Sequence, residues 1–283
     1  MSDVTRPILR YHGGKFRLAP WILGFFPDHK IYVEPFGGAA SVLLLKDRVN
    51  SEVYNDLDSR IVNVFRVMRN LENAAELKRR VELTPFSREE FDASYSEPVD
   101  DIDAAHKTIV RSFMGHGSDS ATRSCRTGFR AKCHSRALSS IEWGKWPDAI
   151  PAFTNRLRGV VIEHRDALEV IERYDTESTL IYADPPYVFS TRTGIQGRTK
   201  STQGYRHEMS DDEHRKLAEV LHAAKGMVVL SGYPSDLYDN DLYADWERFE
   251  RRHVADGGLF RTEVVWINQA CVEALSISRG GLF

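Results

Sequence analysis

The chain has 283 residues, which fits one large domain or a core domain that carries a smaller insertion. Its hydrophobic fraction of 42% can form a sizeable core, so we do not expect wholesale disorder. No apolar run approaches the roughly 18 residues of a membrane span, so we expect no membrane partner. A net charge of −3 argues against a uniformly basic DNA-coating protein. Three cysteines and an N-terminus without an apolar leader predict a reducing, cytoplasmic location.

The N-terminal part alternates short apolar runs with helical patterns. Strands are predicted at 31–33 and 52–55, and helices at 39–46 and 59–71. Between the first strand and the first helix, the segment 34–38 (Glu-Pro-Phe-Gly-Gly) cannot continue a strand and predicts a loop.

The middle of the chain has a different pattern. Helices are predicted at 88–95 and 104–114, followed by a loop rich in Ser, Thr, Gly and Arg, and no apolar strand run occurs. We interpret this region, residues 67–157, as an insertion between two parts of one core, 1–66 and 158–283.

The C-terminal part returns to strand and helix alternation. Ser210 and Glu213 form a capping box that predicts a helix through Ala224. Strands are predicted at 160–162, 179–183, 227–230 and 263–267. This order predicts an α/β fold with a doubly wound, mostly parallel sheet and helices on both of its faces.

The most informative motif is Asp184-Pro185-Pro186-Tyr187, which follows the apolar strand 179–183. Open α/β sheets bind ligands at the carboxyl ends of their strands. Two prolines make the loop rigid and remove two backbone donors, which leaves a carboxylate, free carbonyls and an aromatic ring. Such a loop can hold a planar base through its amine, with Tyr187 stacked on the ring. The structural alternative is an ordinary turn after a strand.

Two further features point to a ligand near the first helix. Phe36-Gly37-Gly38 lets the backbone approach a ligand closely, although such a loop can be a plain turn. Asp56 ends the second strand, 19 residues after Gly37, where an acid can bind a ribose diol. From sequence alone, a helix-capping role for Asp56 is equally compatible.

These motifs together resemble the Dam-like (D12 class) DNA adenine-N6 methyltransferases. Asp184–Tyr187 is similar to the catalytic motif of that family, and Tyr11–Lys15 (Tyr-His-Gly-Gly-Lys) to its opening motif. The segments 33–41, 54–56 and 261–268 resemble its cofactor loop, the acidic end of its second strand and its last core strand. A departure is Ala40, where the family loop usually carries glycine.

The resemblance implies an enzyme that transfers a methyl group from S-adenosylmethionine to the N6 amine of an adenine flipped out of double-stranded DNA. It also implies that Tyr11 and Lys15 close over the cofactor and that Asp166 approaches the cofactor's adenine, although Asp166 can equally cap the helix that follows. The expected catalytic residues are Asp184, Pro185, Pro186 and Tyr187. The expected cofactor-binding residues are Tyr11, Lys15, Glu34, Pro35, Phe36, Gly37, Gly38, Asp56, Asp166 and Asp184.

Two segments are strongly basic within this acidic chain. Residues 104–136 carry seven Lys and Arg and one acid, and residues 189–207 carry four and none. The resemblance implies that the insertion is the target-recognition domain, and solvated surface charge is the alternative. The expected DNA-binding residues are Arg123, Arg126, Arg130, Lys132 and Arg192. The protein is expected to act as a monomer or as a dimer on DNA.

Other functions remain open at this point. Cys125, Cys133, His116 and His134 could supply four zinc ligands, but their spacing fits no standard zinc pattern, and we expect no metal. An RNA or protein-amide methyltransferase could share the core, although such enzymes more often carry Asn in place of Asp184. A catalytically inactive DNA-binding protein on the same core is the other alternative.

Overall fold

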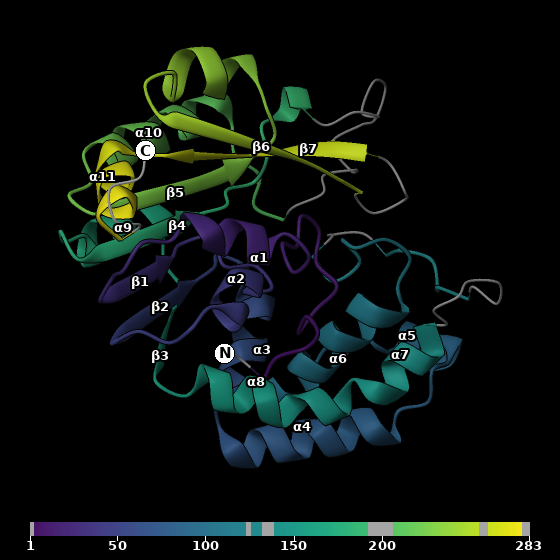
Figure 1. The fold of residues 1–283 in the computed structure, drawn as a ribbon. Helices are drawn as coiled ribbons and strands as arrows, with labels where there is room; N and C mark the ends of the chain where they lie inside the picture. The colour runs from purple at the N-terminus through teal and green to yellow at the C-terminus, as the bar shows by residue number, and fades with distance from the viewer. Residues whose placement is uncertain (1–2, 123–125, 132–138, 192–205, 255–259, 279–283) are drawn as a thin grey trace.

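A computed structural model describes residues 3–122, 126–131, 139–191, 206–254 and 260–278. Seven strands form one sheet in the order β3-β2-β1-β4-β5-β7-β6 (Figure 1). The strands are β1 (Ile31–Glu34), β2 (Ser51–Asn55), β3 (Val160–Glu163), β4 (Thr179–Ala183), β5 (Met227–Gly232), β6 (Glu247–Val254) and β7 (Phe260–Ile267). The first five run parallel, and β7 is antiparallel to both of its neighbours.

Successive side chains of the buried strands enter two different hydrophobic clusters, one on each face of the sheet. Tyr32 joins the cluster on one face and Val33 the cluster on the other. The helices of the first face are α1 (Ala19–Ile22), α2 (Ser41–Leu45), α3 (Ser59–Met68) and α11 (Gln269–Ser278). The helices of the second face are α9 (Ala167–Tyr174) and α10 (Asp211–His222). The predicted doubly wound α/β fold is confirmed.

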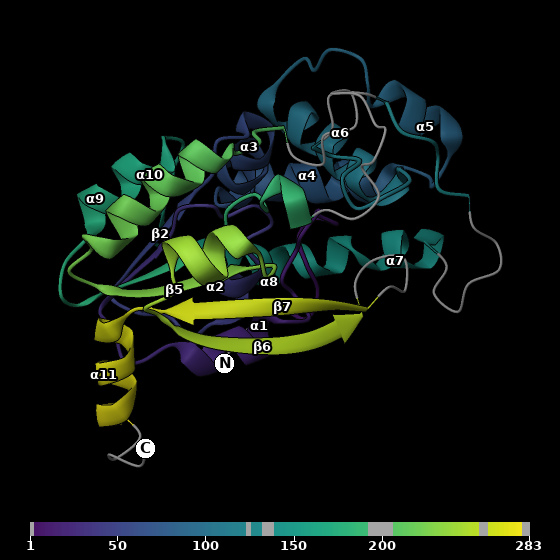
Figure 2. The same cartoon turned by 90° about the horizontal axis from the view of Figure 1, so that it is seen from above.

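In the described part of the chain, five helices besides α3 lie between β2 and β3 in the sequence. These helices are α4 (Leu71–Leu83), α5 (Arg88–Ala93), α6 (Asp101–Met114), α7 (Ser139–Lys145) and α8 (Ile150–Leu157). Figures 1 and 2 show them gathered on one side of the molecule, where α6 packs on α3 and α4. Phe65 of α3, Ile109 of α6 and Trp146 belong to one hydrophobic cluster, so these helices share their core with the sheet.

Short helical turns complete the described elements: the 3-10 turns η1 (Leu23–Phe25), η2 (Pro147–Ala149) and η3 (Phe189–Thr191), and the π-helical turn η5 (Leu237–Leu242). None of the described helices is both long enough and apolar enough to cross a membrane.

Several element boundaries differ from the sequence predictions. The helix predicted at 39–46 begins at Ser41, because Ala40 adopts a left-handed conformation with φ 51°. The helix predicted through residue 71 ends at Met68, and α4 then begins with Asn70 as its N-cap. The capping box is confirmed: the Glu213 amide donates to Ser210 Oγ, and the Ser210 amide donates to the Glu213 carboxylate. Neither α4 nor β6 was predicted.

Candidate active site

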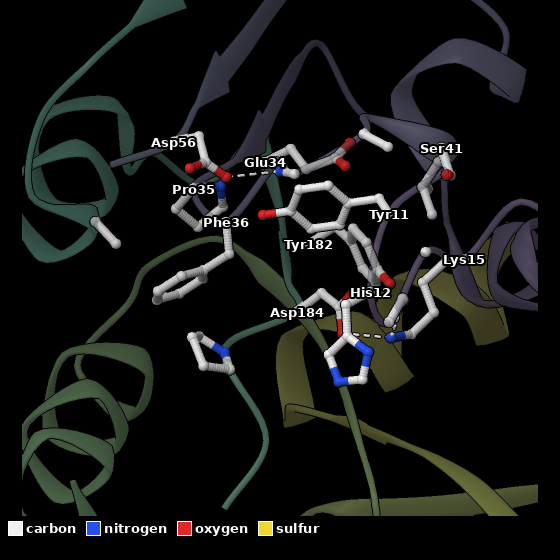
Figure 3. A pocket seen from close by; sticks show the side chains of 18 of the residues that line it. Tyr11, His12, Lys15, Glu34, Pro35, Phe36, Ser41, Asp56, Tyr182 and Asp184 are labelled. Carbon is white, nitrogen blue, oxygen red and sulfur yellow. Dashed lines mark hydrogen bonds and ion pairs between the residues drawn. The ribbon is translucent and has the colours of Figure 1, made fainter. Parts of the chain in front are cut away.

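A cleft opens at the carboxyl ends of β1, β2 and β4, where the order of the strands reverses. Chain crossovers leave this point in opposite directions, so the connecting loops diverge and create space for a ligand. The cleft is open to solvent, and the space within it and at its mouth amounts to about 680 Å³. The predicted residues that line it are Tyr11, Lys15, Glu34, Pro35, Phe36, Gly37, Gly38, Asp56, Asp184 and Pro186 (Figure 3).

The glycine loop after β1 is fixed by its packing. A Cβ atom on Gly37 would lie 2.1 Å from a ring carbon of Tyr54, and Gly38 has a positive φ of 49° beneath the Tyr11 ring. The Tyr54 hydroxyl donates to the Gly38 carbonyl at 2.8 Å. The two glycines are therefore required by the tyrosines around them. Ala40 has the left-handed conformation that a glycine in its place would adopt more easily.

Asp56 lies at the end of the cleft formed by β2. Its Oδ2 accepts a hydrogen bond from the Gly38 amide at 2.8 Å, and its Oδ1 accepts one from the Asp58 amide at 2.7 Å. Burial raises the pKa of Asp56 to about 6. The residue that caps α3 is Asp58, not Asp56. Asp56 thus braces the glycine loop and still borders the cleft, where its remaining lone pairs can accept further hydrogen bonds.

Glu34 ends β1 and is 2% exposed. Its Oε2 accepts hydrogen bonds from the Tyr32 hydroxyl at 2.8 Å and from the Leu43 amide at 3.0 Å. Glu34 therefore supplies the side-chain cap that the N-terminus of α2 otherwise lacks. Burial raises the pKa of Glu34 to about 8, so its carboxyl group holds a proton at neutral pH.

Asn55 is a buried residue that connects three strand ends. Its amide donates to the carbonyls of Pro35 at 2.9 Å and Arg165 at 3.0 Å, and its carbonyl accepts from the Arg165 amide at 2.9 Å. These bonds hold the loops after β1 and β3 against β2. No role for Asn55 was predicted from the sequence. A polar amide side chain at the end of an apolar strand is the signal that could have identified it.

Asp184 lies at the other end of the cleft, directly after β4. Its Oδ1 contacts Lys15 Nζ at 2.7 Å and accepts a hydrogen bond from Ser231 Oγ at 2.9 Å. Within the described parts of the chain, nothing hydrogen-bonds to Oδ2. Burial raises the pKa of Asp184, and the nearby Lys15 ammonium opposes that shift. One carboxylate oxygen is therefore held by the protein, and the other is available at the cleft.

The remaining residues of this motif lie in different environments. Pro186 lines the cleft, and Pro185 is buried between the two lining residues Asp184 and Pro186. Tyr187 is 6% exposed, and its ring stacks on that of Tyr233 with the centroids 4.2 Å apart. Lys15 Nζ lies 4.8 Å from the Tyr187 centroid and donates to its hydroxyl at 2.5 Å. Tyr187 is therefore packed inside the protein and does not line the cleft.

The structure separates Asp166 from the other predicted cofactor residues. Asp166 is exposed, caps α9 by accepting from the Leu168 amide at 2.8 Å, and does not line the cleft, although its neighbour Ala167 does. Of the two roles that the sequence left open for Asp166, this geometry matches the helix cap. Its predicted approach to a cofactor stays a prediction.

Two predicted DNA-binding residues lie on the irregular segment 126–131, beside α5 and α6. Arg126 is 54% exposed, forms an ion pair with Asp92, and stacks on Tyr95 with its guanidinium carbon 5.2 Å from the ring centroid. The Arg130 amide donates to the Met114 carbonyl at 2.7 Å, and one of its guanidinium nitrogens is buried without a hydrogen-bond partner among the described residues. Arg123, Lys132 and Arg192 lie outside the described residues.

The zinc alternative has no support in the described residues. They contain no group of three or more His, Cys, Asp or Glu side chains that could hold a metal ion. Of the four residues considered for zinc, Cys125, Cys133 and His134 lie outside the described ranges.

Known proteins with similar sequences share one activity in their names. The chain is 26% identical to a DNA adenine methylase of Haemophilus influenzae, over 84% of this chain and 82% of that protein. It is 21% identical to the type II methyltransferase M.CviBI of Paramecium bursaria Chlorella virus NC1A, over 89% and 94%. It is 22% identical to a DNA N-6-adenine-methyltransferase of Escherichia phage P1, over 91% of this chain and 34% of that protein.

The family comparison covers nearly the whole chain and includes both ends of the cleft. Residues 11–256 match the family described as D12 class N6 adenine-specific DNA methyltransferase. The resemblance that the sequence motifs indicated is confirmed, and the chain belongs to the D12 class of N6 adenine-specific DNA methyltransferases.

Proposed function

We propose that the cleft binds S-adenosylmethionine across the ends of β2, β1 and β4, and that Asp184 holds the amine of an adenine extruded from DNA. The observation that carries this proposal is that the two oxygens of the Asp184 carboxylate have different surroundings. Its Oδ1 is held by Lys15 and Ser231, and its Oδ2 has no partner among the described residues. A fixed acceptor with one open oxygen suits a ligand that donates a hydrogen bond.

The course of the cleft and the chemistry of its ends suit the cofactor. A nucleoside with a methionine side chain is long and polar at both ends, and the open cleft runs across three neighbouring strands. Asp56, at the β2 end, is placed to accept hydrogen bonds from the ribose hydroxyls. The bound cofactor supplies an activated methyl group on a sulfonium ion, so the protein contributes orientation and electrostatics.

At the β4 end, the protein must make a weak nucleophile reactive. The N6 lone pair of adenine is delocalised into the ring, and in a duplex the amine is stacked and paired, so the base must leave the helix. Asp184 Oδ2 and the Pro185 carbonyl would accept the two amine hydrogens and localise the lone pair. After transfer the amine nitrogen carries positive charge, and Asp184, whose pKa burial raises, is placed to accept its proton.

We further propose that residues 67–157 recognise the DNA target. Arg126 and Arg130 support this role, because both are on the short segment 126–131 and Arg126 is largely exposed. An arginine can form two hydrogen bonds to guanine and read the sequence, or contact phosphate and only position the DNA.

Replacing the proposed acceptor tests this function. Asp184→Ala should abolish transfer of a radiolabelled methyl group from S-adenosylmethionine to unmethylated plasmid DNA, while cofactor affinity in isothermal titration changes little. Asp212→Ala, at an exposed aspartate in the first turn of α10, is the matched control and should retain activity. Methylation by Asp184→Ala at a rate close to that of the wild type would rule out the proposed mechanism.

A further inference from the structure

A buried carboxylate near the catalytic loop has no role in the function proposed above. Glu263, on the antiparallel strand β7, is 1% exposed. A carboxylate that loses its hydration is costly to bury unless nearby charges and hydrogen bonds compensate. A neutral side chain would fill the same place in the strand without that cost, so the charge calls for an explanation.

The contacts of Glu263 lead directly to Asp184. Lys15 Nζ lies 3.4 Å from Glu263 Oε1 and 2.7 Å from Asp184 Oδ1, and Lys15 itself is 4% exposed. The Tyr187 hydroxyl accepts from Lys15 at 2.5 Å and hydrogen-bonds to Glu263. One ammonium group is thus shared between the buried carboxylate of Glu263 and the partly exposed carboxylate of Asp184, which come from different parts of the sheet.

The charge balance of this group favours the proposed reaction. When both carboxylates are ionised, Lys15, Asp184 and Glu263 together carry a net charge of −1. Methyl transfer places positive charge on the amine nitrogen beside Asp184, and a fixed negative group in a buried site stabilises that charge. If Glu263 were neutral, Lys15 would cancel the charge of Asp184, and the acceptor would be weaker.

We propose that Glu263 is a positioning residue that acts through Lys15: by sharing the Lys15 ammonium, it keeps net negative charge on Asp184 at the position of the adenine amine. The proposal rests on the proposed function of Asp184. Glu263 itself does not touch the substrate, and no proton or other group needs to reach it during the reaction.

The groups that face Glu263 and Lys15 come from four parts of the chain. Lys15 itself lies in the N-terminal segment, Asp184 and Tyr187 follow β4, and Tyr233 follows β5. Strands β6 and β7 contribute three charged or titratable residues. The exposed Arg251 lies opposite Glu263 in the strand register, His253 lies near Lys15, and Arg261 lies near Tyr233. Burial raises the pKa of Glu263 to about 7, and the Lys15 charge opposes that shift. The proposed effect should therefore grow as Glu263 ionises above neutral pH.

The test compares charge with shape at this position. Single-turnover methylation of plasmid DNA is measured from pH 6 to 9 for wild type, Glu263→Gln and Glu263→Asp, with rates normalised to the chains that bind S-adenosylmethionine. If the charge matters, the methylation rate of Glu263→Gln falls about ten- to a hundredfold at pH 8, and its rate no longer rises near pH 7. Glu263→Asp should retain more activity than Glu263→Gln, although the Asp side chain resembles Glu less closely in shape than Gln does. The Km for DNA should stay unchanged. Glu263→Leu provides a second neutral variant if the Gln protein does not fold.

A double-mutant comparison tests the path through Lys15. In a Lys15→Gln background, Glu263→Gln should cause no further loss of rate, because the Lys15 ammonium through which Glu263 acts is already absent. Three results would overturn the proposal. The first is a wild-type rate for both Glu263→Gln and Glu263→Leu, and the second is an additive loss of rate when Glu263→Gln is combined with Lys15→Gln. The third is a higher rate for Glu263→Gln than for Glu263→Asp. If Asp184→Ala is inactive while the neutral variants of Glu263 are fully active, only this inference fails. If Asp184→Ala is active, the proposed function fails as well.

Discussion

A buried ion cluster joins the end of α8 to the sheet and provides a sharp test of the stability of this fold. Arg156 donates to the Glu52 carboxylate at 2.6 and 2.9 Å and to the Leu43 carbonyl at 2.6 Å, and Lys46 contacts Glu52 at 2.8 Å. Arg156 and Glu52 are 5% and 3% exposed. Burial alone would raise the pKa of Glu52, but the hydrogen bonds from Arg156 and Lys46 lower it below its usual value.

Arg156→Leu removes one member of this cluster and leaves Glu52 with Lys46 alone. Removal of one partner of a buried ion pair costs about 3–5 kcal/mol, and we expect the lower end of this range because Lys46 still neutralises Glu52. Urea unfolding at pH 7 measures the change in the free energy of unfolding. The matched control is Arg158→Leu, at an exposed arginine two residues away, which should change stability by less than about 0.5 kcal/mol.

The pH dependence gives an independent check of the same cluster. The pKa of Glu52 is lower in the folded protein than in the unfolded chain, so its contribution is present above its unfolded pKa and is lost as the pH falls through the folded value. The difference in stability between wild type and Arg156→Leu should therefore shrink in acid. A loss below about 1 kcal/mol at pH 7 would mean that the cluster contributes no more than a surface ion pair.

Three further predictions concern the cleft and the insertion. Asp56→Ala should weaken S-adenosylmethionine binding by about 1–3 kcal/mol in isothermal titration, and an unchanged dissociation constant in a folded variant would limit Asp56 to bracing the glycine loop. Arg126→Ala and Arg130→Ala should leave cofactor affinity unchanged and weaken DNA binding across a salt series, by about 1–3 kcal/mol at a guanine that either arginine reads. Wild-type binding to every duplex would show that the segment 126–131 is ordinary surface. Burial raises the pKa of Glu34 from 4.5 to about 8, so between these two values the folded protein holds a proton that the unfolded chain has released. The free energy of unfolding should therefore fall as the pH rises from 5 to 9. Glu34→Gln should flatten this fall in urea unfolding, and an unchanged slope would contradict the role given to Glu34.

The sequence predicted the parallel core well, because its strands are short apolar runs followed by loop residues. The placement of Asp184 after β4 and of the glycine loop after β1 follows from those runs alone. Strand β6 was missed because it is an edge strand with many charged residues, so it lacks the apolar run of a buried strand. Helix α4 was missed because Glu, Lys and Arg dominate its exposed side.

Contacts between distant parts of the chain could not be predicted from spacing. The approach of Lys15 to both Asp184 and Glu263 depends on three separate segments that only the folded sheet brings together. Gly37 illustrates a related limit: the sequence favoured a close approach to a ligand, whereas the side chain that excludes a Cβ atom there is Tyr54. A charged residue within the apolar strand 263–267 was the one local signal that pointed to Glu263.

We propose that this cleft transfers a methyl group to the N6 amine of adenine through Asp184. Mass spectrometry tests this on nucleosides from unmethylated DNA treated with the purified protein and S-adenosylmethionine that carries a deuterated methyl group. The wild type should produce N6-methyladenine with the deuterated methyl group, and Asp184→Ala should produce none. Label on cytosine, or equal labelling of adenine by Asp184→Ala, would rule out this reaction at Asp184.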